Sequence, residues 1–592
     1  MRRVDLGAIG VCVAAMGLLF VAARTAAQDA GDVVLPGGVE AVWDMEAADR
    51  EATATRERIC INGLWRFQPA GAEEEPVPVP DSGWGYLKVP GPWPSGSDDC
   101  QAVFPAPRWA HLLPNLDVVW HERDVTVPAD WQGRRIALHL QWINSYARIF
   151  VDGHEAGSVV FPGGEADLTE FVTPGRTHRL ALQVTARRLT SDHSRPLPSE
   201  RGPNQAGGGR NRGLIGDVFL AGTPAGARID DVRIDTSVRE WRLTVTARLA
   251  GLQEGGRYAL RARVLDGDQE VLAAQSEPFT AGDVQDGRFA FSAPWQAPKL
   301  WDTETPENIY RIGVELWDGG RLADACLPVR FGFREFWVDG RDFYLNGVRT
   351  GLRALPIAAA QTSPAYACYE GAREIIERYQ WLGFNAAYTH NYGCTPGAHL
   401  SFDGLLNAAD DTGLLLAFSL PHMNAYNWSD DAAARAYERH LEHYVRQAQN
   451  HPSVVLYSQN HNSIASSADQ NPLALPHGEA LESHPRVPVV YEREHILRRF
   501  DGTRPVYNHS GPSRQITTVN CYLNWVPMQE RAEWFLPWSE EGDRALFLVE
   551  YGEPLIFSYS SVRASWADFR NPSLHQHYYT EWGAQQWGDR SF

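Results

Sequence analysis

The sequence has few cysteines, and none of them has a metal-binding spacing. Seven cysteines occur in 592 residues, with no CxxC pair of the kind found in zinc sites and redox motifs. Besides Cys12 near the N-terminus, these are Cys60, Cys100, Cys326, Cys368, Cys394 and Cys521. A chain of this size does not need disulfides for stability, so we expect most of these thiols to be buried. We expect no bound metal and no cofactor.

Basic residues are also too few for a nucleic-acid-binding protein. Lys and Arg number 54 against 73 Asp and Glu, which gives a net charge of −19. Binding to a phosphate backbone requires a basic surface. This balance argues against nucleic acid as the main partner.

Only one long apolar run is present, from Gly7 to Ala23, and it follows Met1-Arg2-Arg3. Small residues around Thr25–Ala27 complete the pattern of a secretory signal peptide. A membrane anchor is the alternative, but the run is short for one and no second run of spanning length follows. We therefore expect 1–28 to be a signal peptide, no membrane association after its cleavage, and a secreted or periplasmic protein.

Aromatic residues are abundant, with 21 Trp, 21 Tyr and 23 Phe, and the length predicts roughly three or four domains. In an acidic protein, many Trp and Tyr suit a carbohydrate partner, although packing in the cores accounts for most of them. Nothing in the sequence decides the oligomeric state, so a homo-oligomer stays open.

Two all-β regions come first. Over 40–222, short alternating strands separated by turns predict an antiparallel, jelly-roll-like, sugar-binding β-sandwich. Within it, Ala206–Gly213 (AGGGRNRG) is a Gly/Arg loop, for which a place near a cleft is favoured over a phosphate site. A second set of strands over 226–336 predicts an immunoglobulin-like β-sandwich.

From 337 to 592 the pattern changes to strands alternating with helices, which predicts a (β/α)8 TIM barrel. The clearest helices are Tyr369–Leu382 and Ala432–Gln449. The expected strands are 349–356, 384–391, 414–421, 453–461, 505–511, 517–525 and 545–552. An eighth strand is hard to find, so either the chain ends early or another segment closes the barrel.

Polar residues stand at the ends of two buried strands, Ser453–Asn462 and Ala545–Gly552. The carboxyl ends of the strands form the active-site face of such a barrel. We therefore expect the Glu550 side chain to share one cleft with the residues from Gln459 to Asn462.

Several motifs in this order resemble glycoside hydrolase family 2, which contains β-galactosidases, β-glucuronidases and β-mannosidases. The similar segments are Asn62–Phe67, Gly213–Val218, Leu300-Trp301 with Glu307–Tyr310, Phe331–Arg334 and Phe343–Gly347. The resemblance covers nearly the whole chain and implies a hydrolase that cleaves a terminal β-linked sugar by a retaining mechanism.

The resemblance also assigns catalytic positions. Phe547–Gly552 matches the nucleophile strand, so Glu550 corresponds to the nucleophile; a barrel-rim Glu paired with an Arg is the structural alternative. The acid/base segment begins with an intact Asn450–Val454. The acid/base Glu then falls on Asn462, or on His461 after a one-residue deletion, and neither is a carboxylic acid.

Retaining hydrolysis needs a second group, about 5–5.5 Å from the nucleophile, that protonates the leaving oxygen. The amide of Asn462 has no titratable proton, whereas the imidazole of His461 titrates near neutrality. A His461 that only hydrogen-bonds a sugar hydroxyl, or that is a hydrogen-bonded histidine of the barrel without a catalytic role, is an equally good interpretation. Glu553 is a weaker candidate for the proton donor.

Polar and aromatic residues at neighbouring strand ends are candidates for substrate binding. They are Asn460, His390, Asn391, His509, Tyr522, Asn524, Trp525 and Tyr551, with His422 and Asn508 nearby. The family's substrate-binding Gly-Val-Asn-x-His is replaced by Ala354–Ile357. The leading hypothesis is therefore an atypical secreted glycosidase. A catalytically silent carbohydrate-binding or scaffold protein is the alternative, and a changed reaction using the histidines is a third.

Overall fold

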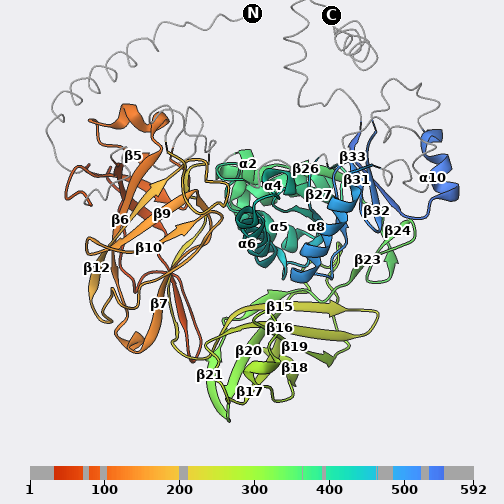
Figure 1. The fold of residues 1–592 in the computed structure, drawn as a ribbon, viewed down its shortest axis with the longest axis horizontal. Coiled ribbons are helices and arrows are strands. Elements are labelled where there is room, and N and C mark those ends of the chain that lie inside the picture. Colours follow the sequence, from red (N-terminus) through yellow and green to blue (C-terminus); the bar gives the residue numbers. More distant parts are fainter. Residues whose placement is uncertain are drawn as a thin grey trace, which may run out of the picture.

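A computed structural model describes residues 33–70, 79–93, 103–198, 211–362, 364–389, 395–461, 463, 484–521 and 532–551. Within these ranges the chain forms three β-rich bodies in sequence order, seen in Figure 1 in red to yellow, yellow to light green, and green to blue. The expected multidomain, β-rich fold is confirmed. The predicted signal peptide lies outside the described residues, and the predicted domain bounds stay predictions.

The first body is a sandwich of two sheets, one with the strand order β1-β2-β14-β7-β11 and one with the order β10-β9-β12-β6-β3-β4-β5. Alternate residues of each sheet, such as Leu138 on one and Leu182 on the other, meet in a shared core. The first sheet contains β1 Arg50–Ala52, β2 Glu57–Cys60, β14 Val218–Pro224, β7 Arg134–Leu140 and β11 Gly164–Asp167. The second contains β10 His154–Val160, β9 Tyr146–Val151, β12 Thr177–Thr185, β6 Val118–Thr126, β3 Gly63–Pro69, β4 Gly85–Val89 and β5 Val103–Phe104. A short ladder of β8 Ile143–Asn144 and β13 Gly213–Leu214 lies beside them.

The second body is a smaller sandwich around a core that includes Val245 and Val314. One sheet has the order β15-β16-β19, and the other has the order β18-β17-β20-β21 with β22 beside β20. The strands are β15 Arg228–Ser237, β16 Arg242–Ala250, β17 Tyr258–Asp266, β18 Gln269–Gln275, β19 Arg288–Pro294, β20 Tyr310–Asp318, β21 Arg321–Ala325 and β22 Val329–Phe331.

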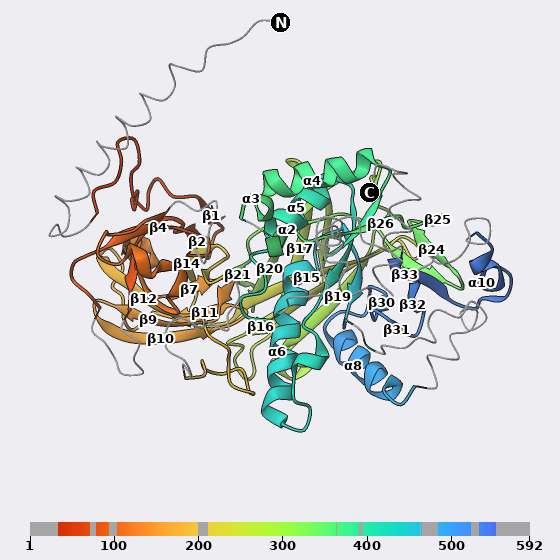
Figure 2. The same cartoon turned by 90° about the horizontal axis from the view of Figure 1, so that it is seen from above.

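The third body is built on parallel strands, after a small meander of β23 Phe336–Asp339, β24 Asp342–Leu345 and β25 Val348–Arg349. Its parallel sheet runs β26 Ala354–Ile357, β27 Ala386–Thr389, β28 Leu415–Ser419, β29 Val454–Ser458 and β30 Val506–Tyr507. Helices connect successive strands: α2 Ala359–Thr362, α3 Pro364–Ala367 and α4 Tyr369–Trp381, then α5 Asp403–Thr412, α6 Asp431–Ala448 and α8 Val487–Phe500. Figure 2 shows these helices covering one side of the strands.

A second sheet of this body contains β31 Gly511–Pro512, β32 Ile516–Cys521 and β33 Ala545–Tyr551, of which β32 and β33 are parallel; α10 Leu536–Glu541 lies between them in the chain. Phe547 and Val549 of β33 join one apolar cluster with Ala417 of β28 and Val455 of β29. The two sheets therefore share an interior. Among the described residues no ladder joins β26 to β33, so these strands do not form a closed ring.

Most of the expected strands are longer than those in the structure, and three of them differ most. The first is shorter and later than 349–356, since β26 begins at Ala354. The fourth ends at Ser458 rather than His461. The fifth is interrupted, because Ser510 has a left-handed φ of 53° and the chain reverses before β31. Both expected helices are present as α4 and α6.

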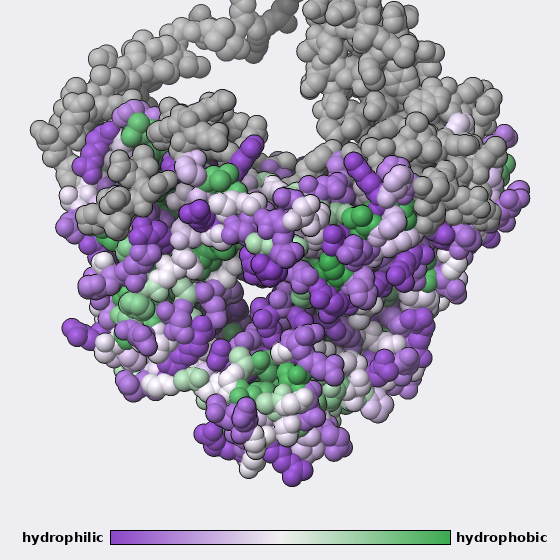
Figure 3. Space-filling model, in the orientation of Figure 1, coloured by the Kyte–Doolittle hydropathy of each residue, from purple (hydrophilic) through white to green (hydrophobic). Residues whose placement is uncertain are grey.

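The described surface in Figure 3 is largely hydrophilic, with separate apolar patches. No helix of the described ranges is long and apolar enough to cross a membrane. Of three free cysteines described there, Cys326 is buried, Cys60 is half-buried and Cys368 is exposed, so the expectation of buried thiols holds for Cys326 alone.

Candidate active site

The ends of four parallel strands lie level with one another. The register pairs Ser419 of β28 with Ser458 of β29, and Ser458 with Tyr507 of β30. The Ser419 backbone N–H donates to the Thr389 hydroxyl at 2.7 Å, and the Ser419 hydroxyl donates to the Thr389 carbonyl at 2.6 Å. The carboxyl ends of β27 to β30 therefore meet at one edge of the sheet, as the sequence predicted.

Strand β33 approaches the same edge across the interior. The Tyr388 hydroxyl of β27 donates to the Val549 carbonyl at 3.3 Å. The ring of Phe547 packs edge-on against Tyr507 of β30, with centroids 5.0 Å apart. These two contacts hold the end of β33 near the ends of β27 and β30.

The ladder between β32 and β33 changes register at its end. Val519 pairs with Leu548, and the next residue, Asn520, pairs with Glu550. Val549 is thus an extra residue of the β-bulge type. The shift brings backbone position 550 into phase with Ala545 and Phe547 along the ladder.

The segment after β29 continues beside the end of β30. The Gln459 N–H donates to the Tyr507 carbonyl at 3.1 Å, the His509 N–H to the Asn460 carbonyl at 2.9 Å, and the Ser463 N–H to the His509 carbonyl at 3.0 Å. Gln459 and Asn460 are buried. Both amide atoms of Gln459 and the Asn460 Oδ1 have no hydrogen-bond partner in the described part of the chain.

Three imidazoles gather at this edge from the ends of three successive strands. The His461 and His509 rings are stacked, with centroids 4.2 Å apart and planes at 29°. The His422 ring is nearly parallel to His461, at 6.2 Å. His509 is 1% exposed and His461 is half-buried. The described residues include no group of three or more His, Cys, Asp or Glu placed to hold a metal ion.

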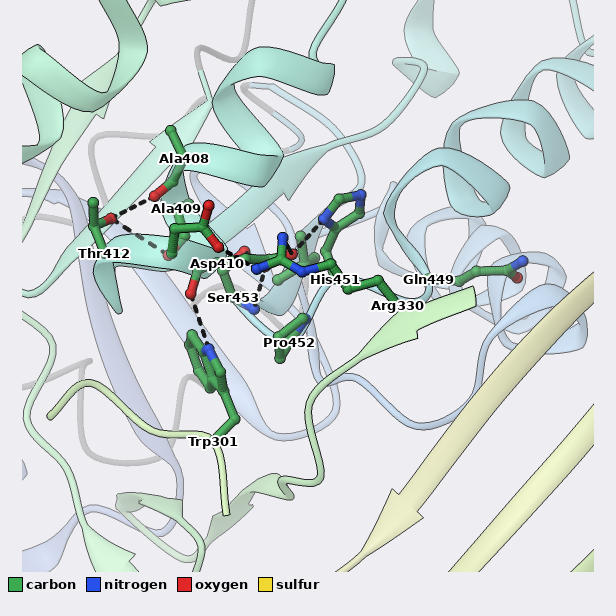
Figure 4. A network of polar contacts seen from close by, with 12 residues as sticks. Trp301, Arg330, Ala408, Ala409, Asp410, Thr412, Gln449, His451, Pro452 and Ser453 are labelled. Atoms are coloured by element: carbon green, nitrogen blue, oxygen red, sulfur yellow. Dashed lines mark hydrogen bonds and ion pairs between the residues drawn. The ribbon is translucent and has the colours of Figure 1, made fainter. Parts of the chain in front are cut away.

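A buried carboxylate fixes the start of β29, as Figure 4 shows. Asp410 Oδ1 accepts hydrogen bonds from the Ser453 hydroxyl at 2.6 Å and the Ser453 N–H at 3.1 Å, and Oδ2 lies 2.7 Å from His451 Nδ1. Trp301 Nε1 donates to the Asp410 carbonyl at 3.0 Å. Helix α5 and the second body thus position the strand that leads to His461.

A buried arginine adds to this anchor. Arg334 donates to the Pro452 and Val454 carbonyls at 2.9 and 2.6 Å, and burial lowers the pKa of its guanidinium to about 9. The side chain of Asn450 also accepts from the Ile234 N–H and donates to the Val232 carbonyl. Asn450 and Arg334 belong to segments that the sequence analysis identified as family motifs, Asn450–Val454 and Phe331–Arg334. The sequence analysis did not identify Asp410.

The candidate site residues fall into three groups. Asn460, His461 and His509 are described and lie together. Glu550 and Tyr551 are described in their backbone alone. Those outside the described residues are His390, Asn391, Asn462, Tyr522, Asn524 and Trp525, and the weaker candidate Glu553.

Residues 227–334 match the family model for glycosyl hydrolases family 2. Over most of its length the chain is also similar to β-glucuronidases. It is 24% identical to a β-glucuronidase from Paenibacillus borealis, over 85% of this chain and 84% of that protein. The chain thus contains a family-2 domain over residues 227–334 and is similar over most of its length to a family-2 type of enzyme, the β-glucuronidases.

Other similarities agree with this resemblance to family 2. A β-galactosidase from Aeromonas hydrophila is 25% identical over 91% of this chain and 53% of its own length. The fold is similar to that of a β-glucuronidase from Ruminococcus gnavus, solved in complex with an N1-substituted uronic isofagomine, with a TM-score of 0.61, 16% identity and 84% of each chain covered. The predicted resemblance to family 2 and the predicted enzyme class, O-glycosyl hydrolase, are confirmed.

Proposed function

We propose that the protein is a retaining glycosidase that removes a terminal β-linked sugar, with Glu550 as the nucleophile and His461 as the acid/base. In the first step the Glu550 carboxylate attacks the anomeric carbon while the His461 imidazolium protonates the leaving oxygen. In the second step neutral His461 accepts a proton from water, which displaces the sugar from Glu550.

The observation that carries this proposal is the contact between the Tyr388 hydroxyl and the Val549 carbonyl. It ties the residue before Glu550 to β27, whose end lies level with the end of β29. The nucleophile position and the segment of His461 thus share one end of the parallel strands. Where an active site needs two groups facing one sugar ring, this shared end supports the assignment.

For the scaffold, we propose a (β/α)8 barrel whose seam lies between β26 and β33. A groove of about 930 Å³ separates these strands, lined by Leu352 and Ala354 on one side and by Leu546, Phe547 and Leu548 on the other. Both strands are sheet edges in the described chain. A groove between two sheet edges supports a seam at this place, and Arg341, Arg349 and Arg353 line it together with these apolar residues.

The first 28 residues support a proposal of export to the cell exterior or periplasm. N-terminal sequencing of protein recovered from culture medium or periplasmic extract tests this. A mature protein that begins near residue 29 is the expected result, and an intact Met1 in a cytoplasmic fraction would contradict export.

A panel of aryl β-glycosides tests the function, beginning with β-glucuronides and β-galactosides because relatives carry those names. We expect turnover of at least one of them. A matching 2-deoxy-2-fluoro glycosyl fluoride should label the peptide that contains Glu550, detected by mass spectrometry, and Glu550→Gln should abolish both labelling and turnover.

The outcomes separate the alternatives. Label on another carboxylate would contradict the assignment of Glu550. Binding of sugars without turnover of any glycoside, activated dinitrophenyl glycosides included, would favour the carbohydrate-binding protein, for which the lack of a carboxylic acid at 461 and 462 is the argument.

A further inference from the structure

The imidazole of His509 takes no part in the two proton transfers proposed for His461. It is almost completely buried, and its ring lies 4.2 Å from the ring of His461 at 29°. The His422 ring is also nearly parallel to that of His461, but it lies 2.0 Å farther away, at 6.2 Å. Of these two described rings, His509 is thus the nearer neighbour of His461.

The backbone holds the two rings in register. Hydrogen bonds on both sides of His461, from the His509 N–H to the Asn460 carbonyl and from the Ser463 N–H to the His509 carbonyl, fix its segment to residue 509. Ser510, directly after His509, has a left-handed φ of 53°. Residues other than glycine adopt this conformation where the surroundings over-determine it. His509 is thus a fixed point, whereas His461 is half-buried at the edge of the site.

We propose that His509 is a positioning residue that holds the imidazole of His461 in its productive orientation by stacking. This inference depends on the proposed function, because it assumes that His461 transfers the proton to the leaving oxygen. An imidazole on a strand end has rotational freedom about two side-chain bonds, and a stacked ring restricts both. Misplacing a catalytic group by about 1 Å is enough to cost about 100-fold in rate.

The test compares His509→Ala, which removes the ring, with His509→Phe, which keeps a planar ring. Substrates are phenyl and 2,4-dinitrophenyl glycosides of the sugar that the wild-type protein turns over, since the phenoxide leaving group needs protonation and the dinitrophenoxide does not. We expect His509→Ala to lower kcat/KM, which reports the first step, by about 10-fold or more on the phenyl glycoside, with kcat/KM on the dinitrophenyl glycoside within about 3-fold of wild type. His509→Phe should restore most of the loss.

Two further variants, His461→Ala and the double variant His461→Ala/His509→Ala, distinguish a failure of this inference from a failure of the proposed role of His461. His461→Ala should show a larger loss on the phenyl glycoside, about 100-fold, and the double variant should be no slower than His461→Ala. A normal phenyl rate in His461→Ala would remove the assumption about His461 and the inference with it. A clear effect of His461→Ala with none of His509→Ala would overturn the inference alone, and so would equal losses in His509→Ala and His509→Phe.

A measurement independent of turnover covers variants that are unstable or inactive. In protein labelled with [13Cε1]-histidine, the ring current of His509 should shift the His461 Hε1 resonance, identified by its absence in His461→Ala. The resonance should move in His509→Ala and stay close to its wild-type position in His509→Phe. An unmoved resonance in His509→Ala would contradict the stacking. His154→Phe, an exposed substitution on β10, controls for the loss of an imidazole elsewhere.

Discussion

Asp410 and Asp411 are adjacent in helix α5, yet their surroundings are opposite. Asp410 is 1% exposed, accepts two hydrogen bonds from Ser453, and lies within hydrogen-bonding distance of the His451 ring. Asp411 is exposed and contacts Arg330 and the Tyr369 hydroxyl on the surface. The first carboxylate organises the start of β29, and the second is a surface ion pair.

Asp410→Ala should therefore lower the free energy of unfolding by about 3 kcal/mol, since it leaves the Ser453 N–H and hydroxyl buried without their acceptor. Asp411→Ala should cost less than about 1 kcal/mol. Urea denaturation of both variants measures the difference. Equal costs would show that the Asp410 network contributes little to stability.

At this scale the sequence predicted residue types better than roles. Asn460, His461 and His509 were predicted at one site, and they do lie together. The stacking of His461 on His509 could not be predicted, because it depends on the point where β29 ends and on the turn at Ser510. Asp410 could not be identified either, because nothing local in an amphipathic helix distinguishes a buried carboxylate from its exposed neighbour.

Among the elements, helix α5 ends on a glycine that also touches the second body. Gly413 has a φ of 75°, and a Cβ built there would lie 2.6 Å from the Thr303 carbonyl oxygen. Gly383, which follows α4, has a φ of 89° but open space around it. Both glycines allow a left-handed helix end, but only Gly413 also permits close contact between two bodies.

We expect Gly383→Ala to cost about 1 kcal/mol of unfolding free energy, the strain of a left-handed residue with a Cβ. Gly413→Ala should cost at least about 2 kcal/mol more, because the clash with Thr303 adds to that strain. Thermal unfolding of the pair measures this. A cost at Gly413 no greater than at Gly383 would mean that the contact relaxes freely.

Elements with strong periodicity were predicted closely, and α6 differs from its expected range by one residue at each end. Strand ends were predicted less well, since β29 and β30 stop where polar residues begin and those residues continue the hydrogen bonding without strand geometry. Apolar content in a sequence indicates that a strand is buried, but it does not show where its ladder ends.

Over the whole molecule, the contact between the first and third bodies is rich in histidine. Trp142 packs edge-on against His399 and His443, and His193 contacts both Tyr426 and His440. Burial lowers the pKa of His399 to about 4 and that of His443 to about 3, and it lowers the pKa of His440 well below its usual range. These rings are neutral in the folded protein near pH 7.

The protein should therefore lose stability in acid. The folded pKa values lie below the unfolded value near 6.5, so below this pH the unfolded chain binds more protons and stability falls as the pH falls toward 4. Between pH 7 and pH 5 we expect a loss of at least about 2 kcal/mol from these histidines together. Denaturant titrations at a series of pH values measure it.

His443→Phe removes one imidazole and keeps a planar ring against Trp142, so its unfolding free energy should fall less between pH 7 and pH 5 than that of the wild type. His154→Phe, on the exposed side of β10, is the matched control. Identical slopes in His443→Phe and wild type would contradict the assignment of acid sensitivity to this contact.

The three-body architecture could be predicted because turn-rich strands and strand-helix alternation leave different patterns in sequence. The contact between the bodies could not, because Trp142, Phe161 and Ile215 look like any other core residues of an all-β region. In the structure these three belong to the apolar cluster of helices α5 and α6 rather than to the sandwich core.

That placement means that the first body depends on the third to cover part of its apolar surface. Cut out as a fragment ending near Pro224, it would carry Trp142, Phe161 and Ile215 into water as an uncovered apolar surface, and such surfaces drive self-association. Attempts to produce it as an independent domain should yield aggregates unless those three side chains are first made polar.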